Sequence, residues 1–298
     1  MMRLLTSGYC MKSALKQIVS SADGDGRVSH PNHASPKKHH WERFTCGRVY
    51  PQIFAEKENG AEPCAMQTEC LLMAHSESPR LRVTLGFLQP IAREMGAFES
   101  QRDAEGQSCQ TWLDAVERKV SAIVDDFDAP IRMSFVFPAS ESREPIQNEN
   151  GGTAGVIFRR HEVLEGRIET KIIRLRHGLY RICARVVNLS SIKRDEVKSP
   201  EKILLRTFAS THFELEADGG EFVSLLTTPP ELQVFADGCR NIGCWPVLAG
   251  DRKAMIASPM IIGDYPQVMP ENSGEFADGT EVGEIPAVRV LTLSDESR

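Results

Sequence analysis

RIETKIIRLRHGLYRICARVVNLS, residues 167–190, is the stretch that decides the fold. Apolar and polar side chains alternate along both of its halves, which is typical of strands with one buried face. His177-Gly178 lies between the halves, and a glycine there supplies the positive φ of a tight turn. The stretch therefore predicts an antiparallel hairpin. The side chains expected on its buried face are Ile168, Thr170, Ile172, Tyr180, Ile182, Ala184 and Val186.

Other segments also have the apolar content of strands. Leu81, Val83, Leu85 and Phe87 alternate with polar or small neighbours, and this pattern predicts a half-buried strand. The further segments predicted as strands are 131–137, 254–262 and 287–293, and a second hairpin is predicted over 211–226 with its turn at Asp218-Gly219-Gly220.

Two segments have helical features. In TWLDAVERKVSAIVDDF, residues 111–127, apolar residues recur every three to four positions, and this spacing predicts the clearest helix of the chain. Residues 227–241 begin with Thr228 as the expected N-cap and with prolines in the first turn. A short helix is expected there, ending at Gly238 or Gly243.

Taken together, the chain contains about eight predicted strands and two or three predicted helices, without regular β-α alternation. This pattern favours an α+β fold, rich in strands, with an antiparallel β-sheet or sandwich and two or three packed helices. Residues 1–44 are rich in polar and small residues toward their end and are expected to form a disordered tail. Residues 45–298 are expected to form a single α+β domain, with any subdivision near the polar loop predicted at 139–155.

Composition excludes several partner classes. The 298-residue chain has a net charge of −6 and a pI near 5.8, which argues against binding to a nucleic-acid backbone. No apolar run reaches the ~20 residues that cross a bilayer, so no membrane insertion is expected. The eight cysteines are scattered, which favours thiols in a reducing cytoplasm over a disulfide framework.

Catalytic and cofactor motifs are missing from the sequence. It has neither a P-loop nor a dinucleotide-binding glycine pattern, and no cofactor is expected. His161-Glu162-Val163-Leu164-Glu165 has a glutamate where a zinc protease helix needs its second histidine, so exposed strand-edge residues are expected instead. No serine elbow is present, although a catalytic triad can be assembled from distant residues. The missing motifs favour a protein that is not an enzyme.

Two cysteine pairs are the weak candidates for a metal site. Cys64 and Cys70 are separated by five residues, and Cys239 and Cys244 by four. Four thiolates would complete a tetrahedral zinc site if the two segments met in space. Because both spacings are wider than the usual two residues, four ordinary packed thiols are the favoured interpretation.

An acidic segment near the end, DYPQVMPENSGEFADGTEVGEI, spans residues 264–285 and contains six carboxylates without a lysine or arginine. Its spacing does not fit the calcium-binding EF-hand loop. Prolines and an Asp-Gly turn favour a fixed path for the backbone. Two interpretations stay open, a docking surface and a solvated connection between strands. The candidate interaction residues are Trp245, Asp264, Tyr265, Glu271, Glu275, Phe276, Asp278, Glu281 and Glu284.

Several longer motifs carry a family resemblance: AMQTECLL (65–72), GLYRICARVVN (178–188), LLRTFASTHFELEADGGEFVSLL (204–226), CRNIGCWPVLAG (239–250) and SPMIIGDYPQVMPENSGEFADGTEVGEI (258–285). From roughly residue 49 to 298 the chain resembles an uncharacterised bacterial protein family found near nickel-iron hydrogenase genes. The resemblance implies an accessory or assembly role, and it provides no catalytic residues.

Two functional hypotheses follow. The first is a cytoplasmic, non-enzymatic accessory protein that docks on a larger protein complex, in which a hydrogenase component is the partner implied by the resemblance. The second is a hydrolase that uses Asp264, Glu281 or Glu284 as acids and His212, in Ser210-Thr211-His212, as the base. Neither hypothesis fixes the oligomeric state.

Overall fold

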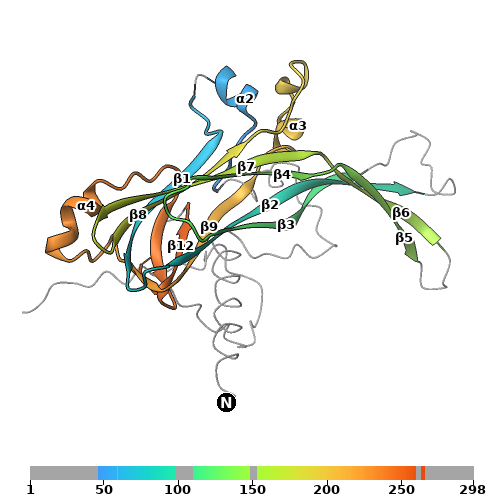
Figure 1. Cartoon of the computed structure of the whole chain (residues 1–298). Helices are drawn as coiled ribbons and strands as arrows, with labels where there is room; N and C mark the ends of the chain where they lie inside the picture. The colour runs from blue at the N-terminus through green and yellow to red at the C-terminus, as the bar shows by residue number, and fades with distance from the viewer. Residues whose placement is uncertain (1–45, 59, 98–109, 148–152, 260–262, 266–298) are drawn as a thin grey trace, which may run out of the picture.

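The computed structural model describes residues 46–58, 60–97, 110–147, 153–259 and 263–265 (Figure 1). It is strand-rich, with two antiparallel sheets, as the predicted fold class requires. In spatial order, the five-stranded sheet contains β10 (Gly220–Val223), β1 (Ala65–Ala74), β8 (Leu179–Asn188), β7 (Leu164–Arg176) and β4 (Ile131–Phe137). The seven-stranded sheet contains β11 (Trp245–Ala249), β12 (Asp251–Ser258), β9 (Ala209–Asp218), β2 (Arg80–Ala97), β6 (Thr153–His161) and β5 (Ser140–Gln147), with β3 (Gln110–Val124) paired to β2.

The helices of the described residues are short. They are α2 (Gln52–Lys57), α3 (Pro200–Leu204) and α4 (Gln233–Asp237), with the 3-10 turns η3 (Glu196–Lys198) and η4 (Pro230–Leu232). In this part of the chain, none of them has the length and apolar character to cross a membrane. Figure 1 places α2 and α3 near each other on one side of the molecule and α4 at one end.

The main core lies between the two sheets. Leu81, Val83, Leu85 and Phe87 of β2 are at most 1% exposed, which confirms the alternation predicted for this strand. On the facing sheet, the odd-numbered residues of β4 pack against the same core, while its even-numbered residues are exposed. Burial of one face of each sheet is the main stabilising contribution expected for such a fold.

The hairpin predicted over 167–190 is confirmed. β7 and β8 pair in antiparallel register, with Ile168 opposite Val186 and Ile172 opposite Ile182. Gly178 lies at the bend with φ of 72°, the conformation for which a glycine was expected. These two strands form the centre of the five-stranded sheet together with β1.

Strand β2 is the longest strand of the described residues, and it divides the seven-stranded sheet into two parts. One side of β2 pairs with β3 from residue 81 to residue 95. The other side pairs first with β9, over residues 80–88, and then with β6, over residues 92–97. We call β5, β6 and residues 92–97 of β2 the arm. Figure 1 shows β5 and β6 projecting beyond the two-sheet body, at the end of the molecule opposite α4.

The helix predicted over 111–127 is wrong, because residues 110–124 form strand β3. Val116, Val120 and Val124 recur every four positions, and this spacing fits a strand face as well as a helix face. In the structure Val124 is 1% exposed on the inner face, whereas Ile123 beside it is 51% exposed. Pairing with the long strand β2 therefore determines the conformation of this segment, whose intrinsic preference is weak.

The polar loop predicted over 139–155 is also wrong where the structure describes it. Residues 140–147 form β5, which pairs with β6. Residues 140–145 are all exposed, so β5 buries neither face and has no apolar alternation that reveals a strand. Residues 148–152 lie outside the described residues.

The second hairpin, predicted over 211–226, is half correct. The chain turns at Gly219, with φ of 77°, as predicted. However, β9 belongs to the seven-stranded sheet and β10 to the five-stranded sheet, so this turn carries the chain from one sheet to the other. The same turn residues suit a hairpin within one sheet and a connection between two sheets, because they depend on the local backbone conformation and not on the strand with which each half pairs.

The remaining predictions near the end of the chain have mixed outcomes. The short helix is confirmed as η4 and α4, with Gly238 as its C-cap. Thr228 does not cap it, because the Thr228 hydroxyl donates to the carbonyl of Ser224 at 2.8 Å. The strand predicted over 254–262 is β12, which ends at Ser258. Residues 1–45 and the strand predicted over 287–293 lie outside the described residues.

Candidate functional site

The first residues of the acidic segment lie at an edge of the seven-stranded sheet. The backbone N–H of Tyr265 donates to the carbonyl of Leu248 in β11 at 2.7 Å. The N–H of Leu248 in turn donates to a carboxylate oxygen of Asp264 at 2.9 Å. Trp245 begins the same strand β11. The structure therefore brings Trp245 to the same sheet edge as Asp264 and Tyr265, although Trp245 lies outside the acidic segment in the sequence.

Asp264 has a structural role at this edge. The hydroxyl of Ser224, just after β10, donates to the second carboxylate oxygen of Asp264. The same hydroxyl accepts hydrogen bonds from the backbone N–H groups of Leu226 and Thr227, at 3.0 and 2.9 Å. Asp264 thus connects the end of β10, in one sheet, with β11 in the other. A carboxylate bonded in this way is stabilising.

The two aromatic candidates differ in accessibility. The Tyr265 side chain is 44% exposed and is available to a partner. Trp245 is partly buried and packs against the cluster of Val247, Ala249 and Ile256. The other candidate interaction residues lie outside the described residues, and their role stays a prediction: Glu271, Glu275, Phe276, Asp278, Glu281 and Glu284.

His212 is a buried residue of β9 with structural partners. It is 4% exposed, and its Nδ1 lies 2.9 Å from the carbonyl oxygen of Ser210. Ser210 has φ of 49°, at a bulge where β9 has one residue more than β2. A Cβ on Gly86 would clash with the ring of His212, so the glycine makes space for it. The histidine fits this bulge as a packing residue.

Glu214 shares the outer face of β9 with His212. Its carboxylate lies 3.8 Å from Nε2 of His212 and 2.6 Å from Nζ of Lys119. Burial raises the pKa of Glu214, but the hydrogen bond from Lys119 and the adjacent His212 outweigh it and lower the pKa to about 2. The partners of Asp264 are different residues, on β11 and after β10. Because Glu281 and Glu284 lie outside the described residues, the hydrolase arrangement stays a hypothesis.

The four candidate zinc ligands do not form a metal site in the described part of the chain, where no group of three or more His, Cys, Asp or Glu side chains is arranged to hold a metal ion. Cys70 and Cys244 are buried, while Cys64 and Cys239 are partly buried. Burial raises the pKa of the Cys244 thiol to about 12, and the thiol donates to the carbonyl of Gln67 at 3.3 Å. Thiolates are what a zinc ion requires, so these surroundings favour packed thiols.

His161 and Glu165 lie in a strand–turn–strand context. His161 ends β6, and β7 begins at Leu164. The expectation of strands in place of a zinc-binding helix is confirmed, but both residues are partly buried and not exposed, and their strands are paired on both sides. His161 is partly buried, and its Nδ1 has no hydrogen-bond partner in the structure.

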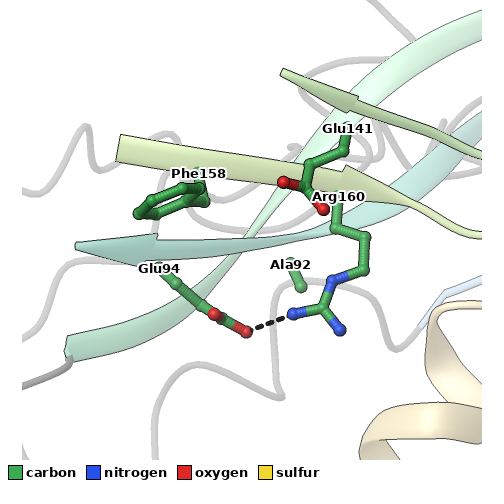
Figure 2. Close-up of a pocket in the computed structure, with 5 residues that line it drawn as sticks. All are labelled: Ala92, Glu94, Glu141, Phe158 and Arg160. Carbon is green, nitrogen blue, oxygen red and sulfur yellow. Dashed lines mark hydrogen bonds and ion pairs between the residues drawn. The ribbon is translucent and has the colours of Figure 1, made fainter. Parts of the chain in front are cut away.

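The sequence reasoning missed the arm. Figure 2 shows a small cavity on one face of it, where Ala92 and Glu94 of β2 face Phe158 and Arg160 of β6 and Glu141 of β5. Arg160 and Glu94 form an ion pair at 2.6 Å. The cavity volume is about 160 Å³, below the ~300 Å³ at which typical small-molecule pockets begin. A ligand of drug-like size does not fit it.

Cross-strand ion pairs hold the arm together. Besides Arg160 and Glu94, Arg159 pairs with Glu144 at 2.8 Å. The guanidinium of Arg143 lies over the Phe158 ring at 5.3 Å. A signal of this arrangement is present in the sequence, since SESREPIQ (140–147) and VIFRRH (156–161) carry complementary charges. That signal becomes readable only when the two segments are known to be strands in register.

Comparisons with known proteins add little. No family model and no curated protein matches the chain. Among solved structures, the chain has a weak similarity to the Salmonella SPI-1 type III secretion injectisome secretin InvG (residues 176 to the end, open gate state), with 11% identity and a TM-score of 0.10. The alignment covers 69% of this chain and 47% of the secretin chain, so the match spans less than half of that protein. Such a low TM-score carries no argument about fold or function.

Proposed function

We propose that this protein is a non-enzymatic accessory or assembly protein that docks on a larger protein complex in the cytoplasm. The arm is the observation that carries this proposal. Residues 140–145 of β5 are exposed, and within the described residues β5 pairs with β6 alone. A strand that buries neither face contributes little to the core, and its exposed faces fit a role in contacting a partner.

The chemistry of the arm supports a protein partner. Its surface combines arginines, carboxylates and Phe158, and arginine and aromatic residues are enriched in protein interfaces. Two charged side chains of β5, Arg143 and Glu141, are 71% and 52% exposed and 3.6 Å apart. They are available to a partner, because an exposed pair of this kind is only weakly stabilising.

The acidic segment is the second proposed contact. It starts at Tyr265, whose exposed ring lies beside β11. A cationic surface on the partner would complement its carboxylates. The resemblance to proteins found near nickel-iron hydrogenase genes suggests a hydrogenase component as that partner, and this link rests on the sequence motifs alone.

Co-purification tests the proposal. The full chain, tagged and expressed at its native level in its source organism, is expected to recover one or more specific proteins in stoichiometric amounts. A charge exchange on the arm, Glu141→Arg with Arg143→Glu, keeps net charge and reverses only the local pattern. This variant is expected to recover at least ~10-fold less partner, the effect of a lost contact of about 1.4 kcal/mol.

A matched exchange at the other end of β2 provides the control. Arg80 and Asp125 form an exposed ion pair at 2.6 Å, with side chains 62% and 63% exposed. Arg80→Asp with Asp125→Arg is expected to leave recovery unchanged. Recovery of no specific protein by the wild-type chain would contradict the proposed function, and equal losses in both exchanges would contradict the role of the arm.

A further inference from the structure

Arg118 of β3 is held in a fixed position where the arm leaves the two-sheet body. Its Nε donates to Oε1 of Gln89 at 2.8 Å, and its guanidinium lies 4.7 Å from the centre of the Phe137 ring. Gln89 is fully buried, and its Nε2 donates to the carbonyl of Glu162 at 2.9 Å. Because the Glu162 carbonyl holds the amide nitrogen of Gln89, the amide oxygen is fixed too, and it sets the orientation of the Arg118 guanidinium.

The charge of Arg118 is not neutralised within the described residues. Its contacts there are Gln89 and Phe137, neither of which is anionic. The carboxylate of Glu162, whose carbonyl holds Gln89, is already paired with Arg206 at 3.1 Å. A partly buried cation without a counter-ion is unfavourable, because desolvation is not offset by an opposite charge.

His161 is close enough to this guanidinium for the charge of Arg118 to lower the pKa of its ring. It precedes Glu162, whose carbonyl holds Gln89, and among the described residues its buried Nδ1 has no hydrogen-bond partner. Burial lowers the pKa of His161, and the charges of Arg118 and Arg159 lower it further. The neutral ring is therefore favoured, and its pKa responds to both guanidinium charges, which makes it a reporter of an anion bound at Arg118.

We propose that Arg118, with His161 in its neighbourhood, binds an oxyanion, the carboxylate or phosphate group of a ligand. Because Nε is used by Gln89, the two Nη groups of Arg118 remain as a fork for two oxygens. Stacking on Phe137 and the bond to Gln89 hold this fork in place before the anion arrives, which reduces the entropy lost on binding. The site does not depend on the docking role proposed above.

The titration of His161, followed by NMR of its imidazole ring, tests this site. Acetate represents a carboxylate and sulfate a phosphate, with chloride replacing either at constant ionic strength. One or both oxyanions are expected to raise the pKa of His161 in a saturable way, because a bound anion offsets the two guanidinium charges. Saturation by acetate alone indicates a carboxylate ligand, and a preference for sulfate indicates a phosphate ligand.

Two variants connect the response to Arg118. In Arg118→Gln, the pKa of His161 is expected to rise without any anion and then to be insensitive to acetate and sulfate. Arg132→Gln, on the 77% exposed Arg132 of β4, is expected to respond as wild type. An unchanged His161 titration in wild-type protein with both oxyanions would overturn the proposal, whatever the folding of the variants. A response that persists in Arg118→Gln would overturn it too.

Discussion

Asn188 offers the sharpest test of how the body is held together. It ends β8 and is fully buried. Its Nδ2 donates to the carbonyls of Val49, at 2.8 Å, and Arg206, at 2.9 Å. Its Oδ1 accepts from the N–H of Ser190 at 2.9 Å. One side chain thus satisfies three backbone groups from three separate segments.

Removing this side chain leaves the Arg206 carbonyl and the Ser190 N–H without their partners, whereas the Val49 carbonyl still accepts from the N–H of Phe208 at 3.1 Å. Each buried unsatisfied group costs about 1–3 kcal/mol, so with two such groups Asn188→Ala is expected to lower the free energy of unfolding by about 2–6 kcal/mol. Water entering the space left by the amide brings the value toward the lower end. Even this is a large share of the ~5–15 kcal/mol that stabilises a typical domain.

Equilibrium unfolding in urea, followed by circular dichroism, measures this loss. The control is Gln233→Ala, because Gln233 is exposed on α4 and its amide donates only to Asp237, at 2.8 Å. The control is expected to change the free energy of unfolding by less than ~0.5 kcal/mol. A loss below about 1 kcal/mol for Asn188→Ala would refute the view that these three hydrogen bonds connect the segments.

Three further predictions concern single residues. Glu214→Gln is expected to lower the free energy of unfolding by about 2–3 kcal/mol at pH 7. Because the pKa of Glu214 is lowered to about 2, this contribution is present above the unfolded pKa of about 4.5 and is lost as pH falls toward 2. The unfolding curves of variant and wild type are therefore expected to converge near pH 2. Gly166→Ala is expected to destabilise by about 1–3 kcal/mol, because its Cβ would clash with the Phe135 ring; an unchanged melting temperature would argue against this packing. The Cys244 thiol, with its pKa raised to about 12, is expected to react with a disulfide reagent far more slowly in the native protein than in denaturant, and equal rates would contradict its burial.

The sequence allowed correct prediction of elements whose side chains face the core. The alternation in 167–190 and from Leu81 to Phe87 reflects burial of one face, so the pattern and the structure have the same cause. The positions of the turns at Gly178 and Gly219 were predictable for a related reason, since both require positive φ.

Elements that depend on distant pairing were not predictable in this way. The valines of 110–124 fit two periods, and only pairing with β2 selects the strand. In β5 no alternation exists, because neither face is buried. The same limit applies to the candidate site: Arg118 attracts notice only when Gln89, Phe137 and Glu162 are known to surround it.

The proposed docking role of the arm is tested by comparing the free chain with its complex. Hydrogen–deuterium exchange of the purified full chain is compared with that of the co-purified complex. The account predicts slower exchange of the backbone amides of 140–147 and 156–161 in the complex, with exchange in β8 unchanged. Equal exchange in both arm strands, with and without the partner, would contradict a docking role of the arm.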